Sequence, residues 1–142
     1  MARTTFSGPV VSQNGFITDH SPTAANAINA TATATAAQVA SGYITSTSAA
    51  ATTITLPTGT LLGAAVSATQ GTVLDLFIDN TAGSNTVTIA VATNGVLSTA
   101  AVDAAAAAGS FGDLTVASGA TGLARFTIMF ASATAYVFTR TA

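Results

Sequence analysis

The chain is 142 residues long, 49% of its residues are hydrophobic, and only 6% are charged. This length suits one domain with a hydrophobic core. The cations are three arginines, and such a small number excludes the usual phosphate-binding footprint of a nucleic-acid-binding protein. Cysteine is absent, which excludes disulfides and thiolate metal sites.

The low charge also bears on whether the protein is assembled or monomeric. Ordinary soluble domains carry about 25% charged residues, and a surface with so little charge repels other copies weakly. We therefore expect an assembled protein rather than a free monomer solvated by Thr, Ser and Asn side chains. No apolar run reaches the ~20 residues of a membrane span, and the start lacks a secretory apolar run. We expect no membrane partner, and a cytoplasmic location until assembly.

Residues 1–20 are expected to form an extended N-terminal arm. Gly8-Pro9 and Asn14-Gly15 are turn signals, and no hydrophobic period is sustained. Apolar side chains exposed on such an arm would cause aggregation, so they need a partner surface. They could fold back onto their own domain or insert into another chain, and the Gly and Pro punctuation favours the second. The predicted partner-binding residues are Arg3, Phe6, Pro9, Val10, Val11, Phe16 and Ile17.

Residues 21–142 are expected to form a single β domain. The alternation in TATATA favours an edge strand despite its alanines. Thr35 and Gln38 have the spacing of a capping box, which predicts one helical turn over about 36–40, with Gly42 at its end.

The stretch TTITLP predicts a strand followed by a helix. Ile54 and Leu56 share one face of the strand, and Pro57 ends it because proline cannot donate to a ladder. Thr58 is then placed to cap a brief helix that runs through Val66.

Two alternating stretches predict a central strand pair. In GTVLDLFIDN, Leu74, Leu76 and Ile78 point one way while Asp75 and Asp79 point the other. NTVTIAV alternates in the same manner, and the intervening TAGS contains a glycine suited to a tight turn. We expect the two strands to pair antiparallel as a hairpin.

The last part of the chain predicts a short strand over 114–116 and then a hairpin. LARFTIMF and TAYVFTR are its strands, joined through residues 131–133. One face of the first strand carries Phe126, Ile128 and Phe130. For the second strand, the inner set is either Tyr136 with Phe138 or Val137 with its neighbours. Roughly six to eight short strands predict an all-β fold, a β-sandwich or jelly-roll-like barrel with one or two short helices.

No residue pattern indicates catalysis, a cofactor or a metal site. The stretch Asp19-His20-Ser21 has triad residue types, but adjacent residues cannot converge on one reacting atom. Asp75 and Asp79 stand ~13 Å apart along a strand, too far for one cation or a glycosidase pair. They either keep one sheet face wet or supply a cross-strand partner for Arg125. No phosphate-binding, dinucleotide or calcium motif occurs. We expect a protein that is not an enzyme.

Three stretches together resemble virion structural proteins of tailed bacteriophages. They are TAAQVASGYITSTSAAATTITLPTGTLLGAAV, GTVLDLFIDNTAGSNTVTIAV and RFTIMFASATAYVFTR. The opening TTFSGPVVSQNGFI resembles the start of phage head proteins of the decoration or cement kind. The resemblance covers about residues 4–140 and carries no catalytic signature.

This resemblance implies an accessory protein on the outside of an icosahedral head, which ties neighbouring capsomers together. Its partners would be the major capsid protein and further copies of itself, often as a homotrimer, and it would assemble in the host cytoplasm. The arm would lie across the capsid or an adjacent subunit, with Arg3 on an acidic patch and the apolar residues as anchors. The alternative is a tail or head fibre module that contacts the host surface, for which Phe111 is the clearest exposed aromatic.

Overall fold

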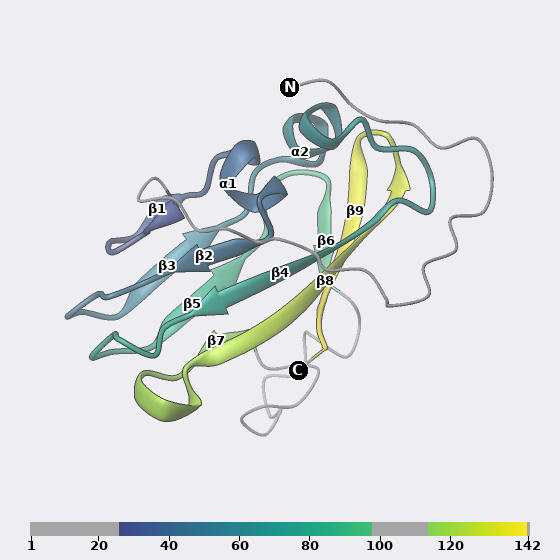
Figure 1. Ribbon diagram of the computed structural model, residues 1–142. Helices are drawn as coiled ribbons and strands as arrows, with labels where there is room; N and C mark the ends of the chain where they lie inside the picture. The colour runs from purple at the N-terminus through teal and green to yellow at the C-terminus, as the bar shows by residue number, and fades with distance from the viewer. Residues whose placement is uncertain (1–25, 98–113, 142) are drawn as a thin grey trace.

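The computed structural model describes residues 26–97 and 114–141, which form a β-rich fold of two mixed sheets (Figure 1). The four-stranded sheet has the order β1 (Ala32–Thr33), β3 (Thr52–Thr55), β5 (Val87–Ala90), β7 (Thr115–Val116). The five-stranded sheet has the order β2 (Tyr43–Thr45), β4 (Val73–Asp79), β8 (Leu123–Ser132), β9 (Ala135–Arg140), β6 (Gly95–Leu97). The helices are α1 (Ala36–Ala40) and α2 (Gly59–Val66), and Gly119–Thr121 forms a 3-10 turn.

Successive described strands from β1 to β8 alternate between the two sheets. In the four-stranded sheet, neighbouring strands are therefore two apart in the chain. β1, β3 and β5 run parallel, as do β2 and β4, and β6 and β9. Only β8 and β9 follow one another within one sheet, as an antiparallel hairpin. This alternation explains why a chain of short strands contains so many parallel pairs.

The predicted hairpin between the two central strands is wrong. β4 pairs with β2 and β8, whereas β5 lies in the other sheet between β3 and β7. Each strand still turns one apolar face to the core, because the buried residues of both sheets belong to one hydrophobic cluster. Asn80 holds the connection by which the chain passes from β4 in one sheet to β5 in the other. Its Nδ2 donates to the carbonyl oxygens of Asn85, Val116 and Ala117 at 2.8, 3.2 and 3.0 Å.

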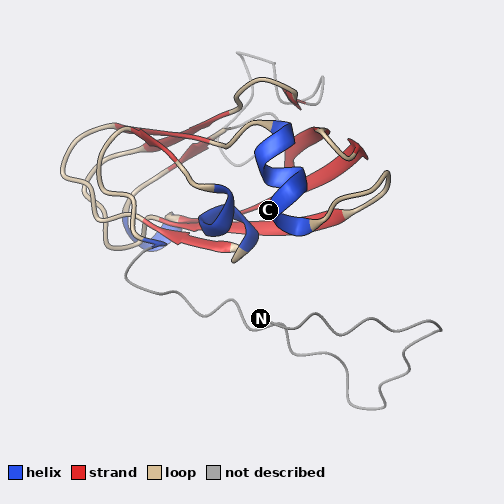
Figure 2. Cartoon of the chain, turned by 90° about the horizontal axis from the view of Figure 1, so that it is seen from above, coloured by secondary structure: helices blue, strands red, loops and turns tan. Residues whose placement is uncertain are grey.

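Both predicted helices are confirmed. Thr35 caps α1 and forms a complete capping box with Gln38, and Ser41 follows as the C-cap residue. Thr58 caps α2, its Oγ1 accepting from the backbone N–H of Leu61 at 3.3 Å. α1 and α2 lie side by side over one end of the two sheets (Figures 1 and 2). None of the helices among the described residues has the length and hydropathy of a membrane span.

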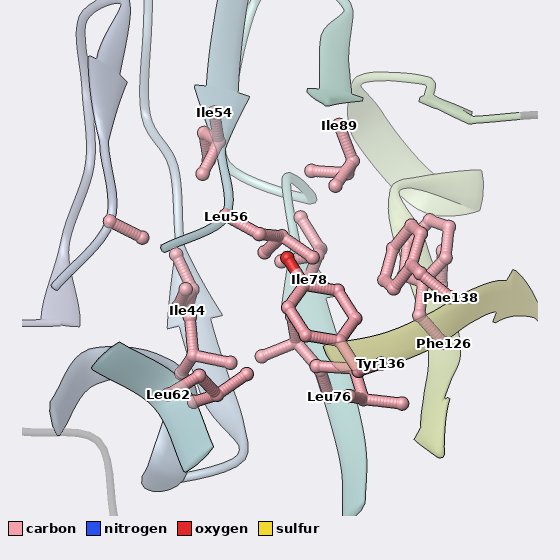
Figure 3. Packing of buried hydrophobic residues seen from close by; sticks show 14 of the residues in the cluster. Ile44, Ile54, Leu56, Leu62, Leu76, Ile78, Ile89, Phe126, Tyr136 and Phe138 are labelled. Carbon is pink, nitrogen blue, oxygen red and sulfur yellow. The ribbon is translucent and has the colours of Figure 1, made fainter. Parts of the chain in front are cut away.

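One hydrophobic core joins the two sheets and the helices (Figure 3). Ile54 and Leu56 are buried together, as predicted, and β8 buries the predicted set of three residues, Phe126, Ile128 and Phe130. In β9, the inner set consists of Tyr136 and Phe138, which are buried, while Val137 faces outward. The rings of Phe126 and Phe138 stack with centroids 4.9 Å apart, so the hairpin closes the core with an aromatic pair.

Candidate interaction surface

The seven residues predicted to bind a partner lie outside the described residues, as do His20 and Phe111. The described chain begins beside β2, the edge strand of the five-stranded sheet. The Nδ2 of Asn26 donates to Ser41 Oγ at 2.8 Å, and Ala27 forms a parallel bridge with Thr45. The N–H of Ile28 donates to the Thr45 carbonyl at 2.9 Å. Residues 26–28 are therefore anchored to that edge.

The outer face of the five-stranded sheet carries an apolar row across four strands. Val73 of β4 is in register with Met129 of β8, Met129 with Val137 of β9, and Val137 with Val96 of β6. Val73, Met129 and Val96 are 51, 51 and 57% exposed. Most of the exposed large hydrophobic residues of the described chain therefore fall on one line. We call Val73, Met129, Val137 and Val96 the apolar row.

A polar row follows the apolar row on the same face. Asp75 is in register with Thr127, whose Oγ1 donates to Asp75 Oδ1 at 3.0 Å. Arg125 Nε lies 4.0 Å from Asp75 Oδ1, and both side chains are nearly half exposed. The cross-strand pairing with Arg125 is thus present, but an exposed pair at this distance adds little to stability. It leaves the Asp75 carboxylate accessible to a further cation.

Asp79, at the far end of β4, is held by its neighbours. The hydroxyl of Tyr43 donates to Oδ2, and the N–H and Oγ1 of Thr81 donate to Oδ1 at 2.9 and 2.6 Å. Partial burial raises the pKa of the Asp79 carboxyl, but the hydrogen bonds from Thr81 and Tyr43 outweigh it and set the pKa below its ordinary value. The hydrogen bond to Asp79, partial burial and the carboxylate charge raise the pKa of Tyr43 to about 12.

Two buried polar side chains hold the sheets together and were not found by sequence reasoning. Asn80 is fully buried, and its three donated hydrogen bonds fix which end of the amide is nitrogen. Arg140 is 8% exposed, and its Nη1 donates to the Thr115 carbonyl at 2.7 Å. The alternation of β9 continues from Phe138 to Arg140, and this pattern could have indicated from the sequence that Arg140 points inward. Both residues serve the fold, because their polar atoms face the backbone of the other sheet.

A groove of about 520 Å³ lies where α1 and α2 begin. It is lined by uncharged residues, among them Thr35, Pro57, Thr58 and the exposed Leu61. No group of three His, Asp or Glu side chains in the described ranges could hold a metal ion. The groove therefore offers apolar contacts and hydroxyl groups, and its lining contains no ionisable side chain.

Comparison with known proteins gives no match: no family model fits the chain, and no curated protein or solved structure is significantly similar to it.

Proposed function

We propose that this chain is a structural virion protein of the capsid decoration or cement kind, which binds the outer surface of a phage head. The observation that carries the proposal is the apolar row on the outer face of the five-stranded sheet. An exposed apolar line of this length is a feature of surfaces that meet another protein. The absence of lysine and glutamate from the sequence supports it, because few charges would have to be desolvated at a contact.

The N-terminal arm is the proposed anchor. Its apolar residues would insert into the capsid or an adjacent subunit, with the major capsid protein and further copies of the chain, as a homotrimer, for partners. Selective binding to the assembled shell adds to the stability of that shell by mass action. Because each contact is repeated by the symmetry of the head, modest individual contacts suffice.

For the body we propose a β-sandwich or jelly-roll-like arrangement. The two sheets contribute their buried faces to one hydrophobic cluster, which is the core arrangement of two packed sheets. Such a body presents two outward faces, one for each sheet. The outer face of the five-stranded sheet is the wider of them and the one that carries the apolar row.

The test is binding to purified phage heads that lack the protein. Full-length protein is expected to sediment with the heads, and protein lacking residues 2–17 is expected to remain in the supernatant. Circular dichroism of the truncated protein checks that the β body is intact. If the folded truncated protein coats the heads as well as full-length protein does, the arm is not the anchor. If neither protein sediments with them, the decoration role fails.

A further inference from the structure

We infer that, before assembly, the apolar row is the docking site for the N-terminal segment of the same chain, residues 1–25. The row consists of apolar side chains outside the buried core of the described residues, and residues 1–25 contain further apolar side chains, among them Phe16 and Ile17. Any release of the segment onto a phage head rests on the proposed function, whereas the docking itself does not.

The first support is where the segment joins the described chain. Ala27 is parallel to β2 at Thr45, and β2 is parallel to β4 with Tyr43 opposite Phe77. Going backward from Ala27, the chain therefore points along β2 toward the end of β4 that holds Val73. That end of β4 is where the apolar row begins.

The second support is length. Ala27 is in line with Thr45 and Asp79, and Val73 lies six residues before Asp79, so about six extended residues carry the chain from Ala27 back to the level of Val73. β8 lies two strands from β2, which is ~10 Å across the sheet and needs about three further residues. Phe16 and Ile17 precede Ala27 by eleven and ten residues and can therefore reach Met129. The remaining residues back to Arg3 are enough to cross the face again.

The third support is complementary charge. Within residues 1–25, the arginine and aspartate side chains are Arg3 and Asp19, which lie sixteen residues apart. The outer face carries the half-exposed Asp75 beside the row, and Asp79 at the end of β4, against the single cation Arg125. Arg3, far along the segment from Asp19, therefore has a carboxylate to pair with on this face.

The tether decides between the chain's own face and that of a second copy. Because the segment is covalently joined to the body, its effective concentration near its own face is of the order of millimolar, far above that of a micromolar protein solution. On a phage head, the shell surface and neighbouring copies are also present at high local concentration. The same apolar side chains can then exchange from their own face to a partner, as a shift between two bound states.

The absence of cysteine permits a direct test in the full-length protein. One variant carries Phe16→Cys with Met129→Cys, in the apolar row. The matched control carries Phe16→Cys with Leu123→Cys, on the same face of β8 but at its other end. Met129 and Leu123 are 51 and 53% exposed, so their thiols would be equally accessible. Oxidation of micromolar protein is followed by a non-reducing gel and peptide mass spectrometry.

We expect an intramolecular disulfide to Met129→Cys in at least about 10-fold higher yield than to Leu123→Cys, given the effective concentration of a docked segment. Equal yields overturn the inference. A disulfide between two chains, obtained by mixing the single-cysteine variants, would place the segment on another copy and also overturn it. As a second measurement without cysteines, Met129→Asp is expected to speed chymotrypsin cleavage at Phe16 several-fold, and Leu123→Asp is not. Equal cleavage rates in those two variants contradict the docking.

The disulfide experiment and the head-binding experiment can fail independently of each other. A Phe16 to Met129 disulfide together with unimpaired coating by protein lacking residues 2–17 would retain the docking and reject the anchor role. Absence of the disulfide together with loss of coating on truncation would do the reverse.

Discussion

Arg140 Nη1 donates a 2.7 Å hydrogen bond to the carbonyl oxygen of Thr115, and this contact joins β9 of one sheet to β7 of the other. The guanidinium also lies 5.9 Å from the centroid of the Phe126 ring. One side chain thus closes the core at the end of β9, by hydrogen bonding to one sheet and packing on the other. Because the charge is mostly buried, its loss should affect stability more than the loss of an exposed arginine.

We expect Arg140→Met to lower the free energy of unfolding by about 2 kcal/mol, because hydrogen bonds from charged donors contribute about 1.5–3 kcal/mol. Methionine keeps most of the apolar stem and removes the donor. Arg125→Met is the matched control, and its exposed pair with Asp75 is expected to contribute less than about 0.5 kcal/mol. Urea unfolding measures both, and equal effects would contradict the role given to Arg140.

Asn80→Asp is expected to be the more damaging of two single-atom changes in the connection between β4 and β5. It replaces the buried Nδ2 with an oxygen that faces three carbonyl oxygens, and we expect a loss above about 3 kcal/mol. Asn85→Asp makes the same change at an exposed position, where Nδ2 donates only to the Ala49 carbonyl, and should cost about 1 kcal/mol. If Asn80→Asp does not fold, Asn80→Ala, which removes the donor without repulsion, is compared in its place. Similar losses of unfolding free energy for Asn80→Ala and Asn85→Asp would show that Asn80 does not hold the connection from β4 to β5 in place.

Gly63→Ala is expected to destabilise the protein although alanine is the better helix former. A Cβ at Gly63 would lie 1.9 Å from the Ala133 carbonyl oxygen, so α2 packs against the β8–β9 turn through a bare backbone. We expect a loss of about 2 kcal/mol, since overpacking typically costs about 1–3 kcal/mol. Ala64→Gly, at an exposed position of the same helix, should lose about 1 kcal/mol from propensity alone. A thermal or urea midpoint that rises in Gly63→Ala would refute this packing.

The Asp79 cluster predicts a pH dependence with a defined sign. The pKa of the folded-state Asp79 carboxyl is lowered, so its stabilisation is present above the unfolded value of about 3.9 and is lost as the pH falls through the folded pKa. We therefore expect the difference in unfolding free energy between wild type and Asp79→Asn to be constant at about pH 6–8 and to shrink below about pH 4. Tyr43→Phe removes one hydrogen bond and should move this decline to higher pH. Urea titrations across that range check both, and a difference that grows on acidification has the wrong sign.

Local signals in the sequence were read correctly because the structures they specify are local. The capping box of Thr35 and Gln38 closes within one helical turn, and the Thr58 cap does the same. The alternation of β8 identified the buried Phe126 and Phe130, since only one face of that strand meets the core.

Pairing between distant segments could not be read in the same way. The alternation in β4 and β5 requires a buried face on each strand, but it is equally satisfied in one sheet or in two facing sheets. In this structure, the placement of β4 and β5 in different sheets is accompanied by hydrogen bonds from Asn80 Nδ2 to the carbonyl oxygens of residues 116 and 117, far along the chain. The apolar row depends on three strand registers at once, so no single stretch of sequence brings Val73 and Val96 together.

The most direct test of the central claim is an electron cryomicroscopy reconstruction of phage particles that carry the protein. We expect density for the two-sheet body on the outer surface of the head, with residues 1–20 leaving the β2 edge and entering the shell or a neighbouring copy. Particles whose head surface lacks this body, or a bound body whose first 20 residues stay on its own sheet and touch nothing else, would contradict the account.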